Sequence, residues 1–144
     1  MCLILDINIL MSALLSPQGA PGKLLDAWER KKFTLIACEA LVREFREVAG
    51  RPFFRTRLRD STAELLAAGL RDFSLFFRDL PSGHTAPYFA RDPKDSYLLA
   101  LAEVSHAEFL VTGDKQLLVL RHHKSTQIVT PVAMIEELKI QGGE

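Results

Sequence analysis

Short apolar segments that alternate with helical patterns constrain the fold of this chain most strongly. Runs typical of buried strands occur at residues 2–5, 34–37, 109–112 and 127–130, with a weaker one at 74–77. Helical periodicity covers residues 20–30, 39–49, 61–71, 93–105, 114–120 and 131–139. This alternation predicts an α/β fold of the doubly wound, three-layer kind, in which helices cover both faces of a parallel sheet.

Length and charge limit the possible functions. The 144 residues contain no repeat or linker, so we expect a single domain over residues 1–144. The 18 basic and 18 acidic residues balance, so nucleic acid would have to bind through a local basic segment. Residues 51–59 form such a segment, with Arg51 and Arg55 as candidate contacts. A solvated loop and helix explains the same residues equally well.

The sequence also indicates a compartment. No apolar run approaches the roughly 20 residues that span a bilayer, and no basic start of a signal peptide follows Met1. We therefore expect a cytoplasmic protein without a membrane segment. Cys2 and Cys38 are expected at opposite ends of the sheet, as reduced thiols.

Two aspartates are expected at one edge of the sheet. Asp6 follows the first apolar run, and Asp114 follows the run at residues 109–112. Ligands of doubly wound sheets bind beyond the carboxyl ends of the strands, where the strand order reverses. The two carboxylates should therefore share one crevice. Each could instead end its strand as a turn former or cap the next helix, a role that Asp often fills.

Two further acids lie on predicted helices. Asp95 is the third helical residue after Asp92 and Pro93, and helical spacing places it on the apolar face. A metal ligand and a helix cap are equally good interpretations of Asp95. Glu44 borders the apolar stripe of the helix at residues 39–49, whereas Glu39 and Glu47 are expected on its solvated side.

Taken together, the four carboxylates favour a metal site. Several crowded carboxylates cannot all ionise without a compensating cation, and all-oxygen ligands select hard cations such as Mg²⁺ or Mn²⁺. Other chemistries find no support. The histidines lack metal-ligand spacing and are expected at the surface, and no glycine-rich phosphate loop or paired-cysteine zinc motif is present.

Four short motifs carry a resemblance to a known family. They are LDINI at residues 5–9, LVREF at 41–45, RDPKD at 91–95 and VTGDK at 111–115. In this order and spacing the chain resembles the PIN-domain family, and within it the PIN-type toxins of prokaryotic toxin–antitoxin systems. The resemblance runs from Met1 to about Glu137.

The resemblance implies a PIN-like, Rossmann-like fold with a five-stranded parallel sheet and metal-dependent cleavage of single-stranded RNA. It assigns the acidic residues Asp6, Glu44, Asp95 and Asp114 to catalysis and to binding Mg²⁺ or Mn²⁺, and Asn8 and Thr112 to orienting ligands or water. A small antitoxin protein and a homodimer are the implied partners.

Two positions depart from the family pattern, and the first of them supports an alternative. Most relatives have Thr or Ser where this chain has Ile7, and Lys94 stands at a position that is often acidic. The alternative hypothesis is a PIN-fold module that binds RNA or protein with weak or no catalysis, because a fold does not fix a function.

Overall fold

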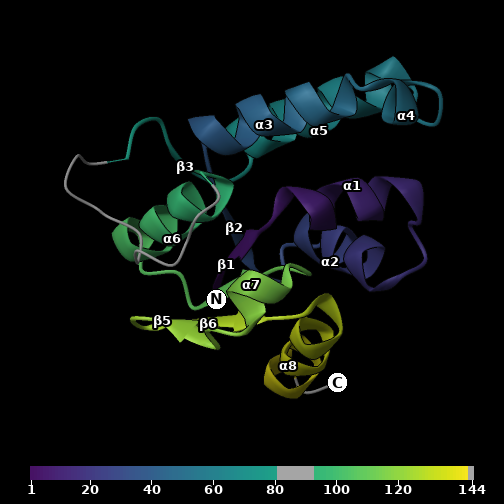
Figure 1. The fold of residues 1–144 in the computed structure, drawn as a ribbon. Coiled ribbons are helices and arrows are strands. Elements are labelled where there is room, and N and C mark those ends of the chain that lie inside the picture. Colours follow the sequence, from purple (N-terminus) through teal and green to yellow (C-terminus); the bar gives the residue numbers. More distant parts are fainter. Residues whose placement is uncertain (81–92, 143–144) are drawn as a thin grey trace.

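A computed structural model of the chain describes residues 1–80 and 93–142. Within that part of the chain, six strands form one sheet in the order β3-β2-β1-β4-β6-β5 (Figure 1). The strands are β1 (Cys2–Leu5), β2 (Thr34–Cys38), β3 (Leu75–Phe77), β4 (Phe109–Val111), β5 (His122–His123) and β6 (Thr126–Val129). Every neighbouring pair is parallel except β5 and β6, which are antiparallel.

The sheet therefore differs from the expected five parallel strands by one added edge strand. The two residues of β5 pair back onto β6 through a tight turn at Lys124, whose φ is 52°. Such a left-handed conformation is uncommon outside glycine and cannot be inferred from hydrophobic pattern. The mixed sheet keeps the predicted α/β class, because the five longer strands are parallel.

The helices form the outer layers. They are α1 (Ile7–Leu15), α2 (Ala20–Glu29), α3 (Glu39–Ala49), α4 (Pro52–Arg55), α5 (Asp60–Asp72), α6 (Pro93–Ser105), α7 (Lys115–Leu118) and α8 (Pro131–Gly142). The first helix packs on α2, which also contacts α8, whereas α6 contacts β2 and β5 from the other side of the sheet (Figure 1). This arrangement follows from right-handed crossovers that run in opposite directions from β1.

Helix α1 occupies residues 7–15, where the hydrophobic pattern predicted no helix. Five residues of α1 are buried, namely Ile7, Ile9, Leu10, Met11 and Ala13. A helix that is apolar on most sides lacks the single stripe by which amphipathic helices are identified. The turn into α2 is close-packed, because a Cβ on Gly22 would lie 1.9 Å from the carbonyl oxygen of Pro17.

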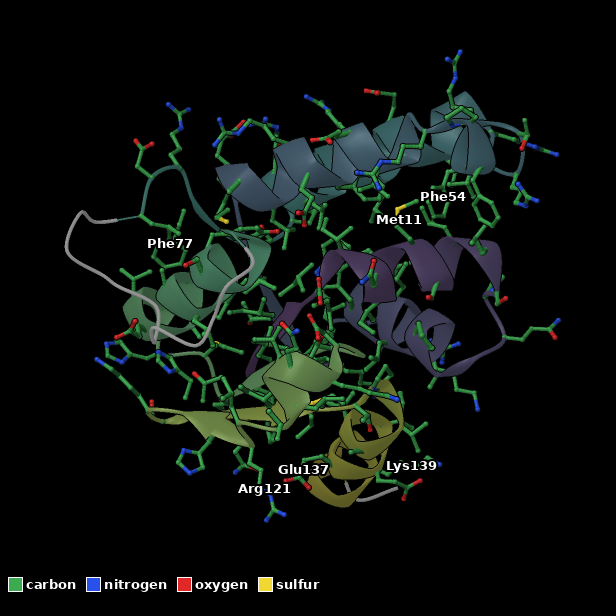
Figure 2. All side chains as sticks on the ribbon, viewed as in Figure 1. Met11, Phe54, Phe77, Arg121, Glu137 and Lys139 are labelled. Carbon is green, nitrogen blue, oxygen red and sulfur yellow. The ribbon has the colours of Figure 1, made fainter. Side chains whose placement is uncertain are left out.

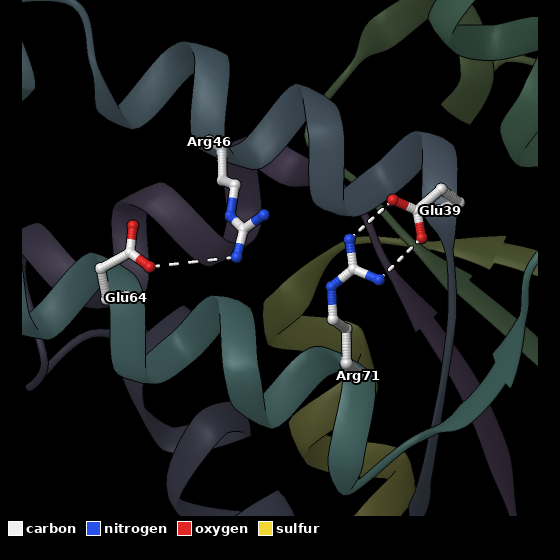
Figure 3. A network of polar contacts seen from close by, with 4 residues as sticks. All are labelled: Glu39, Arg46, Glu64 and Arg71. Carbon is white, nitrogen blue, oxygen red and sulfur yellow. Dashed lines mark hydrogen bonds and ion pairs between the residues drawn. The ribbon is translucent and has the colours of Figure 1, made fainter.

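Ion pairs connect α3 to α5 (Figure 3). The guanidinium of Arg71 donates to both carboxylate oxygens of Glu39, at 2.8 and 2.6 Å, and Arg46 lies 3.9 Å from Glu64. The expectation that Glu39 is a solvated charge is therefore wrong, because α5 brings Arg71 to it. Glu47 is 74% exposed at its side chain, as expected.

Two smaller expectations concern the cysteines and the membrane. Cys2 begins β1 and Cys38 ends the parallel neighbour β2, so they lie at opposite ends of the sheet, and both are free thiols. Across the described residues, we find no helix with the length and apolar character needed to cross a bilayer.

Candidate functional site

Asp6 lies at the carboxyl edge of the central strand β1, where α1 begins. Its backbone N–H donates to the carbonyl of Val111 at 3.0 Å, which extends the pairing of β1 with β4 beyond Leu5. Its side chain makes no capping hydrogen bond to α1, although the residue occupies the N-cap position. The carboxylate therefore does not serve as the helix cap that the sequence allowed.

Thr112 connects Asp6 to the segment that carries Asp114. Its buried hydroxyl donates to Oδ2 of Asp6 at 2.8 Å and accepts the backbone N–H of Asp114 at 3.0 Å. Oδ1 of Asp114 accepts the N–H of Gln116 at 2.8 Å and caps α7. Asp114 thus caps its helix, and it also lies beside Asp6 at the point where the strand order reverses between β1 and β4.

The electrostatic state of Asp6 reflects its burial. Only 5% of the residue is exposed, and this burial raises the pKa of its carboxyl, because the charged form loses its hydration. The hydrogen bond from Thr112 lowers the pKa, as do the nearby amides of Ile7 and Asn8, which lack capping geometry. The charge of Asp114 raises it again. A cation beside these carboxylates would offset both burial and repulsion.

Glu44 is held by a tyrosine that was not among the residues predicted for the site. The phenolic hydroxyl of Tyr97, on α6, donates to Oε1 of Glu44 at 2.9 Å. Burial raises the pKa of Tyr97 above its ordinary value, and the charges of Glu44 and Asp6 raise it further, so the phenol stays a donor. The sequence could have pointed to Tyr97, because it stands in an apolar helical segment and a buried phenol requires a hydrogen-bond partner.

The remaining predicted residues lie in different places. Asp95 belongs to the first turn of α6, but its side chain lies outside the described residues, as does the expected cap Asp92. Asn8 is exposed on the first turn of α1, beside Asp6. Ile7 is 1% exposed and belongs to the core. The structure thus brings Asp6 and Asp114 together and places Asn8 at their border.

Arg51 and Arg55 lie apart from the carboxylates, at the opposite end of α3 (Figure 1). Arg51 precedes α4 and lies 3.5 Å from Glu47, and Arg55 is the last residue of α4. Both are exposed. They form a separate basic surface and are not part of the acidic edge, which is the carboxyl edge of β1 and β4 with Asp6, Thr112 and Asp114.

One histidine differs from the expected surface position. His123, on β5, has a side chain that is 11% exposed, and its Nε2 lies 3.4 Å from Oε2 of Glu103 on α6. Lys124 forms an ion pair with the same carboxylate. The expectation is therefore wrong for His123, because the edge strand β5 packs against α6. His106 and His122 are exposed, and His84 lies outside the described residues.

The oxygen donors at the acidic edge fit a hard divalent cation. Asp6 and Asp114 are close enough for charge repulsion, and Tyr97 is within reach of the charges of both Glu44 and Asp6. Among the side chains that the structure describes, no three acidic, histidine or cysteine residues form a metal site by themselves. A carboxylate pair with open positions suits Mg²⁺, which is bound through one or two carboxylates and retains water.

Comparison with known proteins identifies the family. The sequence model of the PIN domain matches residues 2–116. An uncharacterized protein of Methanocaldococcus jannaschii is 26% identical over 145 aligned positions, which cover 94% of this chain and 90% of that protein. PIN domains are generally nucleases and typically use divalent metal ions. Since the match extends over most of the sheet and the acidic edge, the chain belongs to the PIN-domain family.

Proposed function

We propose that the protein is a metal-dependent endoribonuclease that hydrolyses phosphodiester bonds of single-stranded RNA and uses Mg²⁺ or Mn²⁺. The observation that carries this proposal is the arrangement of Asp6, Thr112 and Asp114 in a PIN domain. A buried carboxylate with a raised pKa beside a second carboxylate destabilises the fold unless a bound cation or substrate compensates for its charge.

Each residue has a role in this proposal. Asp6, Asp95 and Asp114 hold the cation, and Glu44 binds it or orients the attacking water. Thr112 fixes the carboxylate of Asp6, and Asn8 orients ligands or water at the border of the site. A bound divalent cation would supply a water of lowered pKa and positive charge for the phosphoryl transition state.

A cleavage assay on single-stranded RNA tests the proposal. The full-length protein should cut RNA when Mn²⁺ or Mg²⁺ is added and should not cut it in a chelator, and Asp6→Asn serves as the blank. Binding of RNA without cleavage at any cation concentration would favour the alternative, a PIN-fold binding module. The apolar, buried Ile7 at the position after Asp6 is the feature that supports that alternative.

The proposal extends to toxin–antitoxin biology in the cytoplasm. A nuclease that cuts cellular RNA must be silenced until needed, and a small antitoxin could place an Arg against Asp6 or Asp114. A homodimer could use exposed apolar side chains of the α5 region, such as Leu65 and Phe73, which are 72% and 76% exposed. Co-expression with the neighbouring small open reading frame tests the antitoxin, and light scattering tests the dimer.

A further inference from the structure

The positive charge of this neutral protein gathers at one end of α3. Residues 43–59 hold six arginines and two acidic residues, although the whole chain has zero formal charge. Residues 51–59, called the α4 turn below, include α4 and four of these arginines. A local field of this kind attracts a polyanion even when the protein as a whole is neutral.

The α4 turn is anchored by one aromatic ring and presents another to solvent. Phe54 packs against the core, and Figure 2 shows it close to Met11 on α1. The ring of Phe53 meets it at 77°, with 4.9 Å between centroids, and 52% of Phe53 is exposed. The core therefore holds the turn in place while about half of Phe53 stays exposed.

Arg57 lies over one face of Phe53. Its guanidinium carbon lies 3.8 Å from the centre of the Phe53 ring, and its Nη1 donates to the carbonyl of Phe53 at 2.7 Å. The guanidinium is thus fixed before any ligand arrives. Aromatic rings and guanidinium planes are the surfaces on which proteins stack single-stranded bases.

Two other arginines of the turn can meet phosphates. Arg55 and Arg59 are exposed, and among the described side chains neither takes part in an ion pair. Arg51, by contrast, is paired with Glu47 at 3.5 Å. The structure therefore shifts the expected phosphate contacts from Arg51 toward Arg55 and Arg59.

The α4 turn follows the end of α3 beyond Glu44. Glu47 lies nearly one turn further along the helix than Glu44 and about 60° around the axis from it, toward solvent, and it forms the ion pair with Arg51. α3 ends at Ala49, five residues and about 7.5 Å of helical rise beyond Glu44, and the α4 turn follows it. That length of helix corresponds to about two stacked nucleotides of one strand.

We infer that the α4 turn is an anchor for single-stranded RNA, in which one base stacks on Phe53 and Arg57 while Arg55 and Arg59 bind phosphates. The strand would then run along α3 to the acidic edge, and in this respect the inference rests on the proposed function. An acidic peptide would satisfy the arginines but would make no use of the stacking surface.

Equilibrium binding in the absence of divalent cations tests the anchor apart from catalysis. Fluorescence anisotropy with a labelled 12-nucleotide single-stranded RNA is measured in chelator, over a series of salt concentrations. The double variant Arg55→Gln/Arg59→Gln should bind about tenfold more weakly and reduce the salt slope by about 1.4, because each single-strand phosphate contact contributes about 0.7. Phe53→Leu should weaken binding about fivefold or more.

A matched control variant removes the same number of arginines at positions outside the α4 turn. Arg30→Gln/Arg121→Gln removes two exposed arginines far from the turn in sequence and should change the affinity less than twofold. Equal effects of the two double variants would overturn the anchor. Equally tight binding of duplex RNA, or equal competition by polyglutamate, would overturn its assignment to single-stranded RNA.

Cleavage measured with Mn²⁺ on the same variants separates this inference from the proposed function. A wild-type protein that binds through the α4 turn but never cuts RNA would overturn the nuclease proposal and support the anchor. A wild-type protein that cuts RNA, with α4-turn variants that bind and cut as the control does, would overturn the anchor alone.

Discussion

The middle of α3 and the α4 turn beyond its end carry opposite charges in opposite surroundings. Glu44 accepts a hydrogen bond from Tyr97, and Tyr97 also lies within reach of the charge of Asp6, which is 5% exposed. In the α4 turn, Arg55 and Arg59 are exposed to solvent. A buried carboxylate loses hydration and needs a counter-charge, whereas an exposed arginine keeps its charge at little cost. The zero net charge of the chain therefore combines an acidic edge suited to a cation with a basic turn suited to a polyanion.

The largest effect on cleavage is expected from loss of the Glu44 carboxylate on α3. Glu44→Gln should lower RNA cleavage by at least about a hundredfold, because charge stabilisation at such a site is worth several kcal/mol. Glu47→Gln, one turn away and exposed, should leave cleavage nearly unchanged. Initial rates with Mn²⁺ measure both variants. Equal losses would mean that the helix face carrying Glu44 does not define the site.

Asp6→Asn should weaken the stabilisation by metal and should make the metal-free protein more stable. At about a hundredfold excess over its Kd, Mn²⁺ should stabilise the wild type by about 2.7 kcal/mol, and this gain should shrink in the variant. Because burial raises the pKa of Asp6 in the folded state, its protonation stabilises the metal-free fold below the ordinary pKa of 3.8, and this contribution is lost as pH rises through the folded pKa.

Thermal unfolding in chelator at pH 5 and pH 8 gives the sign of that effect. The melting temperature of Asp6→Asn relative to wild type should be higher at pH 8 than at pH 5, since the wild type must carry the buried charge at the higher pH. The opposite trend would mean that Asp6 ionises without cost and that its surroundings already contain a compensating group.

Thr112→Val should impair cleavage, whereas the same substitution at another buried threonine should not. The substitution leaves Oδ2 of Asp6 and the N–H of Asp114 without the hydroxyl, so stability should fall by roughly 1–3 kcal/mol and cleavage by about 10–100-fold. Thr126→Val is the matched control, because Thr126 is 1% exposed and donates to the carbonyl of Ala107. Urea unfolding should show similar losses in both, and only Thr112→Val should impair cleavage.

Tyr97→Phe tests whether the hydrogen bond from Tyr97 to Glu44 contributes to cleavage. Loss of the hydroxyl leaves the Glu44 carboxylate less well oriented, so cleavage should fall about tenfold and the Mn²⁺ concentration for half-maximal activity should rise. The melting temperature should change little. A variant with normal metal dependence and normal rate would show that Tyr97 only packs.

The smallest effect is expected at the structural carboxylate of α3. Glu39→Gln breaks the pair with Arg71, whose proximity lowers the pKa of Glu39, and both side chains are about one-third exposed. Stability should decrease slightly above the ordinary carboxyl pKa of 4.5 and not at all at strongly acid pH. Cleavage should stay at the wild-type rate. A large loss of cleavage would contradict this prediction and would mean that Glu39 acts together with the carboxylates of the acidic edge.

Local pattern accounts for much of the fold and for part of the site. The apolar runs predicted the five longer strands, and the order of elements predicted the three layers, because alternation of strand and helix leaves few topologies. The position of Asp6 directly after β1 likewise follows from the first run. Helix α1 was missed because its apolar residues surround the axis, and β5 was missed because two histidines and a left-handed turn carry no strand signal.

The sequence by itself determined the class of fold, the family and the candidate carboxylates at strand ends and helix faces, since these depend on spacing along the chain. Tertiary structure decided which side chains meet. Thr112 reaches Asp6 across 106 residues of sequence, and Tyr97 reaches Glu44 across 53. The same holds for Arg71 and Glu39, 32 residues apart. Periodicity places each side chain on its own helix or strand, but only packing brings two elements close enough for a hydrogen bond to form.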